Sequence, residues 1–318
     1  MKHLTFGLAL SLGMGLSASA QAQVVGIATS NPGSIFHNIG TAVASAASTA
    51  GMNVTIQPAT SPNQYIPLVN SGGIEFGVAN LQEVAYAFEG REWFSGSENS
   101  NLRVAALIMP LINSVFVRAD SDIFSHSDLR GKPMVDGYTA QQTILPQLDA
   151  IYATEGMTRA DLIPVNVASV VAGADAFIAG DTVGFVFAQG AGKVREADAA
   201  VGGLRALPID PSEENLALLR EHWPVGYFEF ITAGSTPGVE EDGWFFAYPQ
   251  LIFTHSDVAD DVVYNLVKAL AEGTELLSAT FPPFAAFDPQ TNMVRDTGIV
   301  AYHPGAIRYY EEAGLWTE

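Results

Sequence analysis

Short apolar runs that alternate with helix-length stretches constrain the fold of this sequence more than any other feature. In the first third of the chain, the strand-like runs are Val24–Thr29, Val54–Gln57 and Phe76–Ala79, and the helix-like stretches are Ile39–Thr49, Tyr65–Asn70 and Leu81–Glu89. This alternation is typical of βαβ units, in which helices cover both faces of a parallel sheet. The predicted fold class is therefore α/β.

A second series of such units follows two apolar runs, Val104–Ile112 and Ser114–Val117. Its expected elements are Met134–Val135, Gln142–Glu155, Leu162–Val167, Ala172–Ala179 and Gly184–Ala188. Farther along, the expected features are a second crossing at Phe245–Phe253, a surface loop at Gly234–Gly243, and helices at Asp260–Ala279 and Pro304–Ala313. Two αβ series in one chain indicate two lobes.

Residues 1–22 have the order of a secretory signal peptide. A basic start at Lys2 is followed by the uncharged apolar run Leu4–Leu16 and by small residues that end at Ala20–Ala22. The run is shorter than the roughly 20 apolar residues that a membrane-spanning helix needs. We therefore expect cleavage, a mature chain that begins at Gln23 or Gln21, and a periplasmic location.

The composition excludes several classes of function. The chain has no Cys, so disulfides, thiolate metal sites and Cys nucleophiles are ruled out together. It has 14 Lys and Arg residues against 34 Asp and Glu residues, a net charge of −20. Such a chain repels nucleic acid and anionic lipid, and we expect no nucleic-acid partner.

Motifs for catalysis are missing as well. The sequence contains neither a His-Glu-x-x-His metal helix nor a Gly-x-Ser-x-Gly nucleophile elbow. Gly190–Lys193 follows a strand as a phosphate loop would, but Phe187 and Val194 stand where Gly and Ser or Thr are required. We interpret this stretch as a tight turn into a helix. The chain is therefore predicted not to be an enzyme.

The six His residues are scattered and form no pair at metal-ligand spacing. His126, His222 and His255 lie in polar stretches and are expected to face solvent, whereas His303 before Pro304 is expected to fix a turn. No metal and no cofactor are predicted.

Seven stretches in this order carry a family resemblance: Asn31–Gly40, Ser61–Asn80, Asn101–Asp120, Asp128–Lys132, Thr139–Thr143, Gly190–Ala197 and His303–Tyr309. In them the chain resembles the TAXI family of solute receptors, which serve tripartite ATP-independent periplasmic (TRAP) transporters. The first loop departs from the pattern of many members, because Ile35 stands in place of a Thr, and Thr139-Ala140-Gln141 replaces Ser-Gly-Thr.

The resemblance implies a two-lobed periplasmic-binding-protein fold of type II, with two αβ domains joined by two crossing strands. Lobe I would comprise residues 23–112 plus 250–318, and lobe II residues 113–249. The implied function is capture of a small organic anion, carboxylate or amino-acid-like, and its delivery to a TRAP-type membrane permease. We expect a monomer. An alternative partner is a signalling membrane protein, for which the chain would be the ligand-binding input.

Ligands of open α/β sheets bind beyond the carboxyl ends of the strands. This rule selects the loops Ser30–Phe36, Ala59–Tyr65, Asn80–Gln82, Gly137–Gln142 and Gln189–Lys193. The candidate ligand-binding residues are Ser34, Ile35, Phe36, His37, Ser61, Asn63, Tyr65, Asn80, Thr139, Ala140, Gln141, Gln142 and Gln189.

These loops contain almost no cation, and Lys193 is the exception. The N-termini of helices bind anions through unpaired N–H groups, and loops enter helices at Ser34–Asn38, Asn63–Tyr65 and Thr139–Gln142. We therefore expect neutral groups to hold the anion, with Asn63 and Gln141 as the main side-chain contacts.

Two further roles in these loops follow from residue type. Phe36 and Tyr65 would cover the apolar part of the ligand. For Ser34, Ser61 and Thr139, helix capping is an equally good interpretation.

Overall fold

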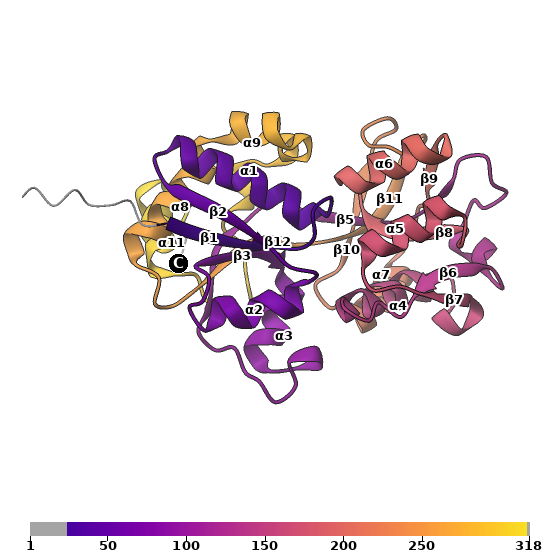
Figure 1. Ribbon diagram of the computed structural model, residues 1–318, viewed down its shortest axis with the longest axis horizontal. Coiled ribbons are helices and arrows are strands. Elements are labelled where there is room, and N and C mark those ends of the chain that lie inside the picture. The colour runs from indigo at the N-terminus through magenta and orange to yellow at the C-terminus, as the bar shows by residue number, and fades with distance from the viewer. Residues whose placement is uncertain (1–23, 317–318) are drawn as a thin grey trace, which may run out of the picture.

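The computed structural model describes residues 24–316 and shows two α/β lobes side by side (Figure 1). Each lobe is built around one β-sheet, the first of five strands and the second of seven. The predicted two-lobed α/β fold class is confirmed. The predicted signal peptide and its cleavage site lie outside the described residues.

The sheet of the first lobe has the strand order β2-β1-β3-β12-β4. Its strands are β1 (Val24–Thr29), β2 (Asn53–Pro58), β3 (Phe76–Asn80), β4 (Leu102–Leu107) and β12 (Gln250–His255). β1 pairs in parallel with β2 and β3, whereas β12 is antiparallel to β3 and β4. The expected fully parallel sheet is therefore wrong, because β12 returns from the second lobe and runs against its neighbours.

Helices lie on both faces of this sheet. α1 and α9 cover one face, and α2 and α3 cover the other (Figure 1). The helices of this lobe are α1 (Ile35–Thr49), α2 (Pro62–Asn70), α3 (Leu81–Glu89), α8 (Asp260–Glu272), α9 (Thr274–Thr280), α10 (Pro289–Asn292) and α11 (Pro304–Glu312). The single helix expected at 260–279 is two helices, since α8 ends at Gly273.

The sheet of the second lobe has the order β10-β11-β5-β8-β6-β7, and β9 also pairs with β5. Its strands are β5 (Leu111–Arg118), β6 (Pro133–Asp136), β7 (Ile163–Asn166), β8 (Gly184–Ala188), β9 (Leu204–Ala206), β10 (Tyr227–Ile231) and β11 (Gly243–Tyr248). Its helices are α4 (Leu145–Ala153), α5 (Val170–Ala179), α6 (Gly192–Val201) and α7 (Glu213–His222). β9, β10 and α7 are not among the elements that the sequence predicted.

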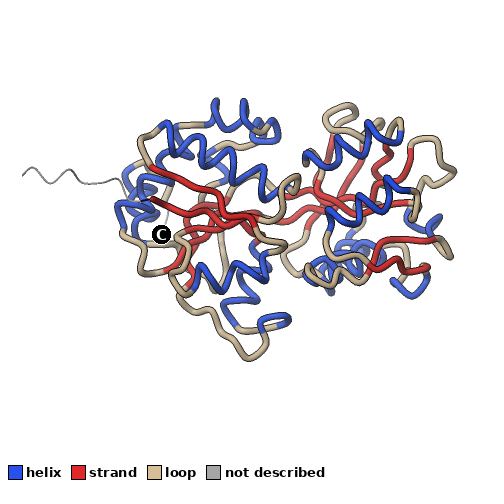
Figure 2. Tube along the Cα trace, viewed as in Figure 1, coloured by secondary structure: helices blue, strands red, loops and turns tan. Residues whose placement is uncertain are grey.

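The chain passes between the two sheets twice (Figure 2). The first passage is residues 108–110, between β4 and β5, and the second is Pro249, between β11 and β12. The predicted crossing at 245–253 is thus two strands that meet at a proline. Proline has no N–H to continue a ladder of hydrogen bonds, so the strand changes sheets there.

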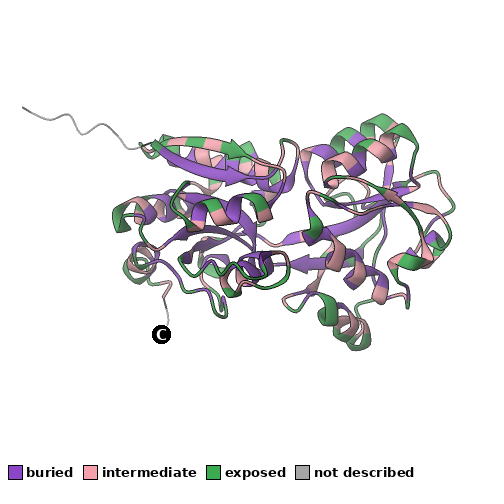
Figure 3. Ribbon diagram, turned by 60° about the horizontal axis from the view of Figure 1, so that its bottom comes forward, coloured by how far each residue is buried: buried purple, intermediate pink, exposed green. Residues whose placement is uncertain are grey.

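Strand direction brings the ends of several strands together between the lobes. β1 and β3 are parallel, and both run against β12, which enters from the second lobe. In the second lobe β8 runs against β5, which enters from the first, and β6 is parallel to β8. The carboxyl ends of β1, β3, β6 and β8 therefore face the opposite lobe. The central strands of both sheets form the buried centre of their lobes, whereas the edge strands β2, β7 and β10 are partly exposed (Figure 3).

Candidate ligand-binding site

A polar pocket lies between the lobes, at the carboxyl ends of these strands. The space among its atoms, part of it open to solvent, is about 430 Å³. It is lined by Ser30, Ser34, Ile35, Phe36, Asn80, Glu83, Leu111, Asn113, Gln141, Ile144, Gln147, Val170, Phe187, Ala188 and Tyr248. Both lobes contribute to these walls.

The loop after β1 and the start of α1 form one wall. Ser34 caps α1, and its Oγ accepts a hydrogen bond of 3.2 Å from the N–H of His37. The N–H groups of Ile35 and Phe36, in the first turn, have no acceptor within the helix. The positive end of the helix dipole is therefore directed at the pocket. At Ser34, capping and a place in the pocket wall occur together.

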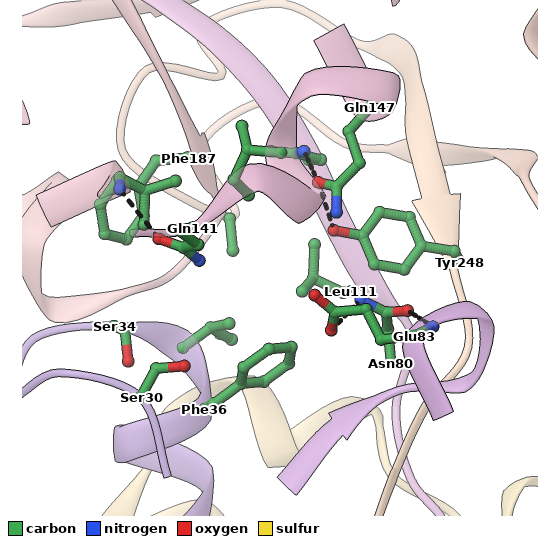
Figure 4. Close-up of a pocket in the computed structure, with 15 residues that line it drawn as sticks. Ser30, Ser34, Phe36, Asn80, Glu83, Leu111, Gln141, Gln147, Phe187 and Tyr248 are labelled. Carbon is green, nitrogen blue, oxygen red and sulfur yellow. Dashed lines mark hydrogen bonds between the residues drawn. The ribbon is translucent and has the colours of Figure 1, made fainter. Parts of the chain in front are cut away.

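Glu83, in the first turn of α3, is the acidic side chain of the pocket. Asn80 caps this helix: its Oδ1 accepts from Glu83 N at 2.8 Å, and its Nδ2 donates to Glu83 Oε2 at 2.6 Å. The carboxylate points into the pocket (Figure 4). The side chain is 1% exposed. Burial raises the pKa of Glu83 to about 7, against the opposing effects of the nearby Thr143 hydroxyl and of Asn80.

Two glutamines of the second lobe present their amide nitrogens to the pocket. Gln147 Oε1 accepts from Asn113 Nδ2 and from the Tyr248 hydroxyl, both at 2.9 Å. Gln141 Oε1 accepts from Val170 N at 3.0 Å. These bonds use the amide oxygens, so each Nε2 remains a donor, and neither has a hydrogen-bond acceptor among residues 24–316.

The turn that carries Gln141 has an unusual backbone. Gly137 has φ of +75°, and Tyr138 has φ of +35° although it is not glycine. A non-glycine residue in this region costs roughly 1–3 kcal/mol, and such strain tends to occur at functional sites. The N–H of Gln141 then donates to Tyr138 O at 2.8 Å, which closes the turn. The strained turn therefore fixes the position of Gln141.

Five of the predicted residues line the polar pocket, namely Ser34, Ile35, Phe36, Asn80 and Gln141. The others do not line it: His37, Ser61, Asn63, Tyr65, Thr139, Ala140, Gln142 and Gln189. Thr139 and Gln142 are exposed. Tyr65 is fully buried, where it stacks on Phe253 and its hydroxyl donates to Val78 O at 2.5 Å. It is a core residue, so the expected cover for a ligand is not at this position.

Ser61 and Ala140 belong to a contact between the lobes. Ser61 Oγ donates to Ala140 O at 2.7 Å and also lies beside Asn63 Oδ1, instead of capping α2. A second contact joins the lobes where the N–H of Lys193 donates to Gly33 O at 3.2 Å. Both contacts hold the rims of the lobes together.

Lys193 is an ion-paired side chain. Its Nζ lies 2.5 Å from Asp175 Oδ1 and 2.7 Å from Glu196 Oε1, and it does not line the polar pocket. Burial disfavours its charge, but hydrogen bonds to both carboxylates outweigh burial and raise its pKa. The one cation of the predicted loops is therefore already neutralised within its own lobe.

Two of the histidines differ from expectation and two agree with it. His222 is exposed, but His126 and His255 are buried rather than solvent-facing. Burial lowers the pKa of His126 to about 4. His303 caps α11 by accepting from Gly305 N at 3.1 Å, so it does fix a turn. Among residues 24–316, no group of three or more His, Asp or Glu side chains is placed to hold a metal ion.

A second, larger cavity lies beside the two passages between the lobes; we call it the hinge cavity. It has about 1180 Å³ of space, part of it open to solvent. It is lined by Ile35, Met109, Pro110, Leu111, Ile112, Gln189, Gly190, Arg195, Ile231, Ser235, Thr236, Pro237, Gln250, Pro282, Pro283 and Ala286. Gln189, a predicted ligand contact, lies here. Its Nε2 donates to Ser114 Oγ at 2.8 Å, and its Oε1 accepts from Thr236 Oγ1 at 3.1 Å.

Glu83, Asn113, Gln147 and Tyr248 are site residues that were not predicted. Glu83 had a readable signal, because Asn80 followed three residues later by Glu83 resembles a capping box directly after a strand. Asn113 lies in β5, Gln147 within α4 and Tyr248 at the end of β11. Nothing local in the sequence marks these three.

The two lobes and the pocket between them define a periplasmic-binding-protein fold. One solved structure with this arrangement is a periplasmic transporter, with 10% identity, 92% of this chain and 93% of that chain covered, and a TM-score of 0.53. Another is a protein from Bordetella bronchiseptica, with 12% identity, 92% of this chain and 98% of that chain covered, and a TM-score of 0.52. A third is the binding-protein component of an ABC phosphonate transporter from Pseudomonas aeruginosa, with 8% identity, 84% of this chain and 80% of that chain covered, and a TM-score of 0.52.

A family assignment goes further than these distant likenesses. The model of the NMT1-like family matches residues 27–314, nearly all of the described chain. The chain belongs to the NMT1-like family. None of the helices within residues 24–316 is long and apolar enough to cross a membrane.

Proposed function

We propose that this chain is a periplasmic solute-binding protein that captures a small organic acid, carboxylate or amino-acid-like, in the polar pocket. The observation that carries the proposal is a pocket built from both lobes, into which buried residues present donors that have no acceptor among residues 24–316. Gln141 Nε2, Gln147 Nε2 and the first N–H groups of α1 all meet there. Buried donors normally have acceptors, and a bound ligand would supply them.

The carboxylate would lie at the N-terminus of α1, between Ser34 and Gln141. Helix N–H groups and an amide Nε2 are suitable donors to such an anion, and the helix dipole favours its negative charge. Neither Lys, Arg nor His is among the lining residues. Neutral groups from both lobes would thus hold the carboxylate, while Phe36 and Phe187 would contact the apolar part of the ligand.

Capture would involve closure of the lobes about the two passages near residues 107–117 and 245–253. We propose lobe I as residues 23–112 plus 250–318 and lobe II as 113–249. The Ser61–Ala140 and Lys193–Gly33 contacts would form at the rim when the lobes close. Because each passage is short, the lobes would move as rigid bodies about a hinge.

The remaining parts of the proposal concern the setting of the protein. A cleaved signal peptide at residues 1–22 would place it in the periplasm as a monomeric receptor, and it would deliver its ligand to a TRAP-type permease. The seven stretches of TAXI resemblance support this partner. A binding role fits a pocket that has one acid, several amides and no side chain arranged as an activated nucleophile among its lining residues.

The test is a thermal-shift screen of small organic acids, followed by calorimetric titration of those that bind. A ligand that binds only the folded state raises the melting temperature. Gln141→Ala should weaken binding, whereas Thr139→Ala, an exposed change in the same loop, should not. If no acid shifts the melting temperature, or if the two variants bind equally to the wild type, the polar pocket is not a receptor site for such acids.

A further inference from the structure

The polar pocket contains one carboxylate, Glu83, and no cation of the described residues neutralises it. Its hydrogen bonds come from Asn80, which binds Oε2 with its side chain and is itself neutral. The Thr143 hydroxyl lies near the carboxylate and lowers its pKa, but it too is neutral. Charged groups are seldom fully buried without a partner, because desolvation is costly. Packing alone gives no reason to keep an acid in this position, whereas a ligand group could supply the missing partner of its carboxylate.

Resting on the proposed function, we propose that Glu83 recognises a cationic nitrogen on the ligand. The ligand would then be a small zwitterion, with a protonated amine or related nitrogen at Glu83 and a carboxylate at the N-terminus of α1. Glu83 would contact the ligand directly and determine which carboxylates are accepted.

The polar groups of the pocket are separated in a way that matches such a ligand. The donors Gln141 Nε2 and the Ser34 end of α1 lie on one side, and the Glu83 carboxylate faces them from the other side (Figure 4). The hydrogen bond from Val170 N to Gln141 Oε1 fixes the amide so that nitrogen, not oxygen, is presented. A molecule that carries only negative charge would find no favourable partner on the Glu83 side.

A second mode exists in which Glu83 stays protonated and donates a hydrogen bond to a simple anion. Charge favours the cationic mode, because an ionised carboxylate and an ammonium form a hydrogen bond about twice as strong as a neutral one. The net charge of −20 also attracts cationic groups and repels simple anions at long range.

The two modes have opposite proton linkage. The ionisable groups that face Glu83 from neighbouring elements are Tyr65 on α2 and Tyr248 on β11, and burial raises the pKa of both well above the usual range. Glu83 is thus the lining residue of the pocket that titrates near neutrality. A cationic nitrogen selects the ionised acid, so binding releases protons and affinity rises from pH 6 to pH 8. A simple anion selects the protonated acid, so binding takes up protons and affinity falls from pH 6 to pH 8.

The experiment compares carboxylates that differ by one nitrogen: alanine with propanoate, 4-aminobutanoate with butanoate, and leucine with 4-methylpentanoate. Each is titrated calorimetrically at pH 6, 7 and 8, in two buffers with different ionisation enthalpies, which reports proton uptake or release. We expect the nitrogen-bearing member of at least one pair to bind about 10-fold tighter or more, with proton release near pH 7.

The matched variants are Glu83→Gln and Glu89→Gln, both on α3, of which Glu89 is exposed. Glu83→Gln should lose the preference for nitrogen and the proton release, while Glu89→Gln keeps both. If the nitrogen-free members bind as tightly or tighter, with proton uptake, Glu83 acts as a hydrogen-bond donor and this inference is overturned while the receptor function stands. If neither series binds, the proposed function fails and the inference with it. The wild-type proton linkage gives an answer even if Glu83→Gln folds poorly.

Discussion

The polar pocket and the hinge cavity lie between the same two lobes and share Ile35 and Leu111, yet they differ in what remains unbonded. The hinge cavity is the larger, at about 1180 Å³ against about 430 Å³. Most of its polar side chains are bonded, Gln189 to Ser114 and Thr236, and Arg195 Nη1 to Gly190 O at 2.7 Å, although Gln250 Oε1 has no partner among the described residues. In the polar pocket, by contrast, two amide nitrogens have no acceptor among residues 24–316, and the Glu83 carboxylate has a hydrogen bond from Asn80 but no cationic partner there. We therefore base the proposed ligand site on the unbonded donors and the acid of the polar pocket, and not on cavity volume.

The difference has a consequence for folding. Folding completes most hydrogen bonds of the hinge cavity without a ligand, so substitutions there should affect stability more than binding. The polar pocket holds a buried acid without a cationic partner and amide donors without acceptors, which destabilises the unliganded protein. Substitutions there should weaken binding, and at Glu83 the empty protein should become more stable.

The largest expected effect is on stability, at Glu83. Because the pKa of Glu83 is raised to about 7 in the folded state, the folded protein binds more protons than the unfolded chain above the usual value of 4.5. Stability is therefore lost as pH rises from 4.5 to 7. Glu83→Gln removes this loss, so relative to the wild type it should gain about 3 kcal/mol between pH 4.5 and pH 8.

Urea unfolding of the unliganded protein at both pH values measures this difference. Thr236→Val, which removes a hydrogen bond in the hinge cavity, should change stability by the same amount at pH 4.5 and pH 8. A Glu83→Gln protein whose stability relative to the wild type does not change with pH would mean that the buried acid carries no such cost, and the two cavities would then differ less than we infer.

The next effect concerns binding and compares two glutamines. Gln141→Ala removes a donor from the proposed carboxylate site and should cost ~1.5–3 kcal/mol, or roughly one to two decades in affinity. Gln189→Ala in the hinge cavity should lower the melting temperature, because Ser114 loses a partner, but affinity should change less than about 2-fold. Calorimetric titration of both variants with any ligand found in the screen measures the two losses of affinity. Equal losses of affinity would extend the site into the hinge cavity.

Local pattern was enough to predict much of the fold and five of the residues that line the polar pocket. The runs at β1, β3 and β6 predicted strands whose following loops carry Ser34, Asn80 and Gln141, because strand–loop–helix order is local. Sheet direction was missed at β12, since the return of the chain from another lobe leaves no local mark.

Residues brought in by distant pairing were also missed. Asn113 reaches Gln147 and Tyr248 only through the packing of β5, α4 and β11, which lie far apart in the sequence. Tyr65 fits both a core and a pocket role by type, and only the rotation of α2 on its sheet decides that it packs against Phe253. Glu83 looked like an ordinary helical acid, although the cap at Asn80 turns it inward.

A smaller effect is expected at the rim, where closure itself can be tested. Ser61→Ala removes the hydrogen bond to Ala140 O and should cost about 1 kcal/mol of closure, or roughly 5-fold in affinity. Small-angle scattering should then show a larger radius of gyration for the unliganded variant than for the wild type. Ser71→Ala, an exposed change whose hydroxyl bonds locally to Leu68 O, is the control and should change neither quantity. An unaltered radius and affinity in Ser61→Ala would show that this contact does not hold the lobes closed.

The smallest effect is expected at Lys193, the cation of the predicted ligand loops and the rival to a site made of neutral donors. Its charge is paired with Asp175 and Glu196, whose side chains are 60% and 61% exposed. Both carboxylates are therefore solvated when the lysine is removed, and the rim contact to Gly33 uses only the backbone N–H of Lys193. Lys193→Met, which keeps the buried aliphatic stem, should change affinity by less than about 2-fold and leave its salt dependence unchanged. Titration at two salt concentrations is the measurement. A large loss, together with near-normal binding by Gln141→Ala, would place the anion at a lysine on the rim and would remove the reason for distinguishing the polar pocket from the rest of the cleft.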